Sequence, residues 1–219
     1  MLRKRNKPDI TIHHLGVSQS DRVVWLMEEL GLPYKLKWHN RSPEGLMPPD
    51  YLDLHPAATA PVIQDGDRTL TESAVILEYI CHKYADGKLT VGPDQPNYYD
   101  YLYWMHFHNS ILGLFFVSGA LRMQSSPDTE RMRGFMKKRE DRYFNYLNQR
   151  LGEVPYLAGD AFTCADVLLM FDLTFLAGQG LSSVDALANI KAYVARIAQR
   201  PAYIKAMQIA GPAAKAPAA

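Results

Sequence analysis

The chain has 219 residues, of which 47% are hydrophobic and 21% charged, and its formal net charge is +1. This balance excludes a disordered chain, and the length suits one large domain or two small ones. Charges of both signs are balanced in each half, so no basic face for nucleic acid is expected. The two cysteines, Cys81 and Cys164, form no CxxC or metal-binding pattern. Two distant cysteines are too few for a disulfide-rich protein, so a reducing compartment is favoured.

Neither a membrane span nor a secretory signal is expected. The longest apolar run, residues 111–117, is interrupted by Gly113 and is too short to cross a bilayer. Residues 1–5 are basic but lack the apolar segment of a signal peptide, so we interpret them as a solvated arm of a cytoplasmic protein. The Ala/Pro-rich tail from Gly211 is expected to fray.

The first part of the chain alternates strand and helix patterns. Residues 10–14 predict a strand, 21–30 an amphipathic helix that ends at Gly31, and 34–38 a second strand. Residues 61–63 and 69–71 flank the turn Asp65-Gly66-Asp67 and predict a hairpin, which is followed by a helix over 73–84. The order is βαβ and then ββα, so a parallel pair and an antiparallel hairpin share one sheet.

The second part predicts helices alone. Residues 89–97 are rich in turn formers and form the best linker in the chain. Helices are predicted after it over residues 97–123, 127–151, 165–177, 184–199 and 201–209, with Ser126 capping the second ahead of Pro127. The expected architecture is a mixed-sheet domain over residues 9–88 and an all-helical domain over residues 98–210.

Three short segments could carry chemistry. The turn over residues 15–22 leads into a helix, whose N-terminus stabilises anions, although Ser18 or Ser20 acting as a simple cap is the commoner role. Pro61 could merely begin a strand, but a cis bond before it would let the backbone pair with an extended peptide. Glu72 and Ser73 could meet the ammonium and carboxylate groups of an amino acid, or Ser73 could only cap its helix.

The order and spacing of these segments resemble a known family. The pattern consists of Ser18-x-x-x-Arg22, Leu30-Gly31-Leu32-Pro33-Tyr34, His55-Pro56, Ala60-Pro61-Val62, Glu72-Ser73-Ala74, the run from Tyr156 to Asp166, and Arg200-Pro201-Ala202-Tyr203. It resembles the glutathione transferases over residues 10–209. The run from Ser18 to Tyr34 is most similar to the serine-type bacterial and fungal branch, including the yeast Gtt and Ure2-related transferases.

The resemblance implies a thioredoxin-like first domain that binds glutathione as co-substrate. It implies a cytoplasmic homodimeric detoxification enzyme that conjugates the glutathione thiolate to hydrophobic electrophiles, with peroxidase activity as a further possibility. The thiolate-stabilising hydroxyl maps to Ser18, with Ser20 as its competitor. The glutathione-binding residues map to Thr59, Ala60, Pro61, Val62, Glu72 and Ser73.

This chain departs from the family before the proline, where it has Ala58-Thr59-Ala60 instead of the usual Gly-Lys or Gln. Arg41 and His55 are candidate substitutes for the missing contact to the glycine carboxylate. No tyrosine stands at the end of the first strand, where His13 and His14 are found.

The resemblance also implies an electrophile pocket, for which Leu15, Val17, Tyr103 and Phe107 are the candidate residues.

A metal site is not expected, because His106 and His108 lie on different faces of their helix. Asp166 is interpreted as a structural cap with Thr163 as its partner. The alternative function is a transferase-like module that binds or regulates without catalysis; a glutathione-dependent thiol–disulfide enzyme is disfavoured because the first turn lacks a cysteine.

Overall fold

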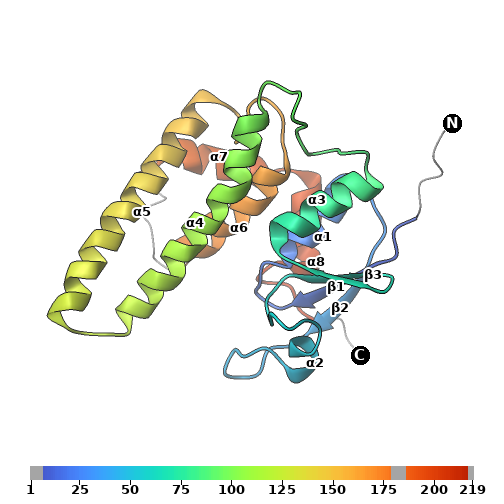
Figure 1. Ribbon diagram of the computed structural model, residues 1–219, viewed down its shortest axis with the longest axis horizontal. Helices are drawn as coiled ribbons and strands as arrows, with labels where there is room; N and C mark the ends of the chain where they lie inside the picture. Colours follow the sequence, from blue (N-terminus) through green and yellow to red (C-terminus); the bar gives the residue numbers. More distant parts are fainter. Residues whose placement is uncertain (1–6, 179–185, 217–219) are drawn as a thin grey trace. The chain divides into compact units, whose positions relative to one another are not determined.

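The computed structural model describes residues 7–178 and 186–216, which form two compact units. The first unit comprises the chain up to Thr90 together with the C-terminal segment from Ala198, and the second runs from Val91 to Ile197. Figure 1 labels the helices of both units and the strands β1, β2 and β3.

The first unit is built on a four-stranded sheet in the order β2-β1-β3-β4. Strand β1 (Ile10–Leu15) pairs in parallel with β2 (Lys35–His39), and helix α1 (Asp21–Leu30) connects them. Strand β3 (Val62–Asp65) runs antiparallel to β1 and to β4 (Arg68–Thr71), with which it forms a hairpin. The predicted thioredoxin-like sheet is therefore confirmed.

Strand β1 occupies the centre of the sheet and is buried on both faces. Ile10, Ile12 and Leu15 are enclosed, and so are His13 and His14. Two adjacent buried histidines need partners, because an unpaired polar group in a core is costly. This requirement shapes the site described below.

Helix α1 is the centre of the helix packing in the first unit. Helix α1 packs against α3 (Ser73–Tyr84) and against α8 (Pro201–Ala210), the last described helix of the chain. Arg200 holds α8 to α1 through two ion-pair contacts with Glu29, Nε to Oε1 at 2.7 Å and Nη2 to Oε2 at 2.8 Å. The sequence-based boundaries place α8 in the helical domain, whereas its packing lies with α1.

The second unit is helical. It contains α4 (Tyr98–Arg122), α5 (Pro127–Glu153), α6 (Cys164–Gly178) and α7 (Ala188–Ala198), and α4 packs against both α5 and α6. Figure 1 shows α4 and α5 as the two long helices of this unit, in green and yellow. Ser126 accepts a hydrogen bond from Thr129 N at 3.1 Å, which confirms the predicted cap before Pro127.

A buried carboxylate organises the start of α6. Asp166 accepts hydrogen bonds from Thr163 N at 2.8 Å, Leu157 N at 3.0 Å and Tyr193 Oη at 2.8 Å. The bond from Thr163 N closes a capping box, so Asp166 has the structural role that the sequence predicted. Burial nevertheless raises the pKa of this carboxyl.

Some predicted elements need correction. The polar stretch after β2 contains a one-turn helix, α2 (Pro49–Leu52), that the sequence did not predict. Helix α7 begins at Ala188, not at Val184, which itself lies outside the described residues, as does the basic arm over residues 1–5. Within the described residues, no helix is both long and apolar enough to cross a membrane.

Candidate active site

The turn between β1 and α1 holds a chain of buried hydroxyl and imidazole groups. Ser18 Oγ donates to the carbonyl of Leu15 at 2.6 Å and lies 2.8 Å from Ser20 Oγ. Ser20 Oγ lies in turn 2.8 Å from His14 Nδ1. Ser20 and His14 are fully enclosed, whereas Ser18 keeps 7% of its surface exposed.

Ser20 does not cap α1, whereas Ser18 Oγ accepts a hydrogen bond from Ser20 N at 3.4 Å just ahead of the helix. Ser20 is the N-cap residue by position, but it adopts a helical conformation and its side chain makes no cap hydrogen bond. Its hydroxyl turns instead to His14 and Ser18. The other predicted cap also fails, because Ser73 is the first residue of α3 and Glu72, at φ 70°, precedes it.

The imidazole of His14 is fixed in an apolar setting. Its ring meets the Trp38 indole edge-on, with 4.3 Å between the centroids. Burial and the neighbouring His39 lower the pKa of His14 to about 4, so the ring is neutral near pH 7. Nε2 of this ring is buried and has no hydrogen-bond partner in the part of the chain that the structure describes.

A second polar cluster joins the first turns of α1 and α3. Arg22 Nη1 donates to Ser73 Oγ at 3.2 Å and also to Gln19 Oε1. Arg22 and Ser73 are both buried, which places a cation beside a hydroxyl at the start of α3. Such a pair is suited to recognising a carboxylate.

The segment before β3 is the one for which the sequence predicted backbone pairing with a peptide ligand. The Ala60–Pro61 peptide bond is cis. Thr59 is exposed, Ala60 is half-buried, and Val62 is buried opposite His13 of β1 and Thr71 of β4. Glu72 is exposed beyond the end of β4.

Arg41 contacts the first turn directly. Its Nε donates to Gly16 O at 2.9 Å and its Nη2 to Val17 O at 3.4 Å, while Nη1 donates to Gly45 O at 2.9 Å. His55, the other candidate for the glycine carboxylate, accepts from Ala57 N at 3.1 Å within its own loop. Arg41 thus ties the backbone before Ser18 to the loop after β2.

The candidate pocket residues have different surroundings. Leu15 is fully buried with Tyr51 and Val62, and Val17 is about half exposed at φ 51°. In the helical unit, Tyr103 stacks on Phe107 with 5.6 Å between the ring centroids. Both belong to the lining of a cavity of about 390 Å³ in that unit, together with Tyr99, Leu102, His106, Ser110 and Tyr143.

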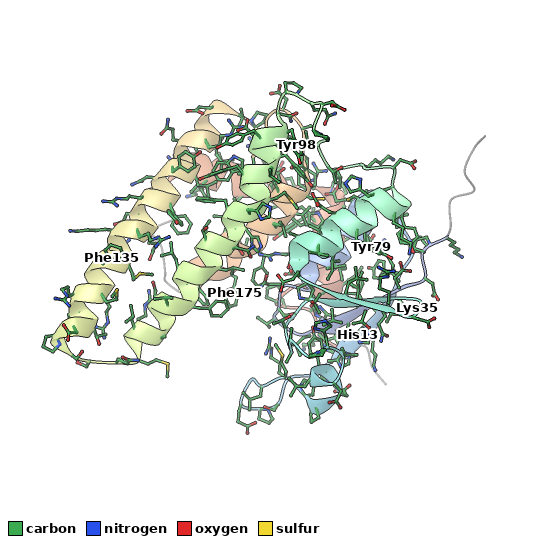
Figure 2. The ribbon with its side chains drawn as sticks, in the orientation of Figure 1. His13, Lys35, Tyr79, Tyr98, Phe135 and Phe175 are labelled. Atoms are coloured by element: carbon green, nitrogen blue, oxygen red, sulfur yellow. The ribbon has the colours of Figure 1, made fainter. Side chains whose placement is uncertain are left out.

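A separate histidine chain includes the other face of β1. His13 Nδ1 lies 3.0 Å from His39 Nε2, and His13 Nε2 lies 3.0 Å from Gln64 Oε1. His39 Nδ1 lies 2.8 Å from a carboxylate oxygen of Asp50. Figure 2 labels His13 on its strand. Burial lowers the pKa of both histidines, and no group of three potential metal ligands occurs within residues 7–178 and 186–216.

Comparisons with known proteins match both parts of the chain. The sequence model of the glutathione S-transferase N-terminal domain matches residues 18–83, and that of the C-terminal domain matches residues 120–201. Glutathione S-transferase 3 of Schizosaccharomyces pombe is 32% identical over 206 residues, covering 88% of this chain and 84% of the relative. The chain belongs to the glutathione S-transferase family. The predicted identity as a glutathione transferase is thereby confirmed.

Solved structures agree with this assignment. The crystal structure of a glutathione S-transferase from Actinobacillus pleuropneumoniae is 30% identical and has a TM-score of 0.84, with 92% of each chain covered. A sphingomonad glutathione S-transferase complexed with glutathione is 23% identical with a TM-score of 0.73, covering 93% of this chain and all of the other, and supports the fold alone.

Sequence reasoning missed two residues of these clusters. Arg22 was quoted only as part of the family pattern, and His14 was noted only as a residue at the end of the first strand, with no role assigned to it. Arg22 stands in the buried face of an amphipathic helix one turn after Ser18, and this position was the available signal. The sequence carries no local signal for the contact between His14 and Ser20, since the two side chains come from different elements.

Proposed function

We propose that this glutathione S-transferase conjugates the thiolate of glutathione to hydrophobic electrophiles, with Ser18 as the thiolate-stabilising residue. The observation that carries the proposal is the Ser18 hydroxyl in the first turn, adjacent to the N-terminus of α1 and more exposed than Ser20. A glutathione thiol with an ordinary pKa near 8.5 is mostly protonated at pH 7, so a catalyst has to lower that pKa.

Glutathione has a γ-glutamyl end with both a carboxylate and an ammonium group. We assign the carboxylate to Ser73 and Arg22, because Arg22 Nη1 and Ser73 Oγ are 3.2 Å apart and present a cation and a hydroxyl together. The exposed carboxylate of Glu72 is assigned to the ammonium group. Residues 60–62 are assigned to the backbone of the cysteinyl residue of glutathione. Thr59, which precedes them, is assigned to the part of glutathione next to that residue.

The chemistry follows from the Ser18 hydroxyl. Rotation about the Cβ–Oγ bond lets its proton turn from Leu15 O to the sulfur, where the hydrogen bond favours thiolate over thiol. The thiol proton passes to solvent. The thiolate electron pair then forms the carbon–sulfur bond as the leaving group departs with the electron pair of its own bond. Ser18 keeps its proton throughout and is not a nucleophile.

The oligomeric state, the electrophile contacts and a peroxidase activity are further parts of the proposed function. The homodimer in the cytoplasm, the electrophile contacts from Leu15, Val17, Tyr103 and Phe107, and the reduction of hydroperoxides by the same thiolate remain predictions. The competing function is a module that binds glutathione without turnover.

A panel assay with purified full-length protein separates these functions. Glutathione is supplied with an aryl halide, an epoxide, a hydroperoxide and a disulfide, and turnover is compared between wild type, Ser18→Ala and the matched control Ser125→Ala at an exposed serine. The proposal predicts conjugation that falls at least tenfold in Ser18→Ala and is unchanged in the control. Glutathione binding without turnover of any substrate would support the non-catalytic module instead.

A further inference from the structure

We propose that His14 is a positioning residue which, acting through Ser20, keeps the Ser18 hydroxyl aimed at the glutathione sulfur. This inference rests on the proposed role of Ser18. It adds a residue that neither touches glutathione nor reacts with it.

The geometry consists of three consecutive hydrogen bonds. His14 Nδ1 lies 2.8 Å from Ser20 Oγ, Ser20 Oγ lies 2.8 Å from Ser18 Oγ, and Ser18 Oγ lies 2.6 Å from Leu15 O. His14 and Ser20 are fully enclosed, so water does not compete for these bonds. These hydrogen bonds therefore connect the buried imidazole of His14 to the partly exposed hydroxyl of Ser18 in the first turn.

Counting protons leaves two arrangements. The buried imidazole is neutral, since its pKa is lowered to about 4, and it carries a single N–H. In the first arrangement Nδ1–H donates to Ser20, Ser20 donates to Ser18, and the Ser18 proton is left for Leu15 O or the sulfur. In the second, Ser20 donates to Nδ1, and Ser18 is drawn to donate to Ser20.

The surroundings of Nε2 favour the first arrangement. Nε2 is buried without a hydrogen-bond partner in the described residues. With the proton on Nδ1, Nε2 is an unpaired acceptor; with the proton on Nε2, it is an unpaired N–H donor, which buried sites tolerate less well. Packing against the Trp38 edge holds the ring in place.

The first arrangement has a consequence for catalysis. A hydroxyl that already accepts a hydrogen bond is a stronger donor, so the bond from Ser20 strengthens the one from Ser18 to the sulfur. Because Ser18 accepts from Ser20, its own proton is excluded from that direction and points to the sulfur or to Leu15 O. His14 thus sets the donor-to-acceptor direction of all three hydrogen bonds.

The tautomer can be measured without any assay of activity. Imidazole-¹⁵N labelled protein is analysed by two-bond ¹⁵N–¹H correlation spectroscopy at pH 7, with His14→Asn used to assign the His14 signals. The Nδ1–H pattern is expected for His14. The Nε2–H pattern would overturn the proposal.

The second test uses two substitutions of equal size. In His14→Asn the amide can still donate to Ser20, whereas His14→Leu has nearly the same shape and cannot. The pKa of bound glutathione thiol, followed by thiolate absorbance, is expected to rise by about half to one pH unit in His14→Leu and in Ser20→Ala. His14→Asn is expected to restore much of the wild-type value, and KM for glutathione is expected to change less than about twofold in all three.

The double variant His14→Leu/Ser20→Ala is expected to match either single variant, because both break the same chain. If Ser18→Ala raises the thiol pKa while Ser20→Ala and His14→Leu leave it unchanged, this inference is wrong and the proposed function stands. If Ser18→Ala also leaves it unchanged, the proposed role of Ser18 is wrong. Should His14→Leu fail to fold, Ser20→Ala and the tautomer measurement still decide the matter.

Discussion

The buried guanidinium of Arg22 donates to the hydroxyl of Ser73 across 3.2 Å and so joins the first turns of α1 and α3. The two residues are 51 positions apart in the chain, yet together they present the cation and the hydroxyl that a carboxylate requires. The expected ligand group is the γ-glutamyl carboxylate of glutathione.

Removing the Ser73 hydroxyl is therefore expected to weaken glutathione binding. Ser73→Ala should raise the dissociation constant about tenfold or more, since a hydrogen bond to a charged group contributes about 1.5–3 kcal/mol. Ser73→Thr keeps the hydroxyl and serves as the matched control. Isothermal titration with glutathione measures both variants, and equal affinities in Ser73→Ala and wild type would remove Ser73 from the site.

Arg41 is expected to act on the loop before Ser18 rather than on the glycine carboxylate. It donates to Gly16 O and Val17 O, so Arg41→Gln should disturb the first turn whatever the glycine end of the ligand carries. Glutathione and its glycine ethyl ester are compared by titration. The same loss of affinity for both ligands is expected. A loss of affinity for glutathione alone would show that Arg41 binds the glycine carboxylate.

The buried histidines make stability depend on pH. The folded-state pKa of His14 is about 4 against an ordinary value of 6.5, so the unfolded chain binds the extra proton between these values. Stability is then full above pH 6.5 and falls as the pH drops toward 4. His14 alone accounts for a loss of about 2 kcal/mol by pH 5.

Urea unfolding at pH 7.5 and pH 5 measures this loss. His14→Asn removes the titrating group and should flatten the difference, leaving the smaller contributions from His13 and His39, whose pKa values are lowered in the same direction. An equal pH dependence in wild type and His14→Asn contradicts the assignment.

Asp166 is expected to stabilise the helical unit without taking part in catalysis. Asp166→Ala leaves the donors of Leu157, Thr163 and Tyr193 buried without this acceptor, so unfolding should become easier by about 2–4 kcal/mol. Tyr193→Phe removes one of these bonds and should cost about 1 kcal/mol. Denaturant unfolding measures both, and the activity per folded molecule should stay close to wild type.

Local signals predicted most of the fold. Gly31 ends α1 at φ 63°, the two residues Gly66 and Asp67 separate β3 from β4, and Ser126 with Pro127 starts α5. Each of these depends on residues close together in the chain, which a sequence pattern can register. Helix α2 was not predicted because a helix of a single turn is too short to show a hydrophobic periodicity.

Contacts between distant residues explain the remaining errors. Helix α7 begins at Ala188, and Asn148 of α5 accepts hydrogen bonds from the N–H groups of Asn189 and Ile190 in its first turn. Ser20 does not cap α1 because the Nδ1 of His14 competes for its hydroxyl. Neither partner could be read from the helix-forming tendency of the segment itself.

The most direct test of the central claim is the pKa of glutathione bound to wild type and to Ser18→Ala. Thiolate absorbance near saturation is followed through a pH titration, with S-methylglutathione as the blank because it has no thiol. In the wild type, the pKa of the bound thiol is expected to lie about one to two units below 8.5. In Ser18→Ala, this pKa is expected to rise most of the way back to 8.5. The same lowered pKa in both proteins would contradict the assignment of Ser18 as the thiolate-stabilising residue.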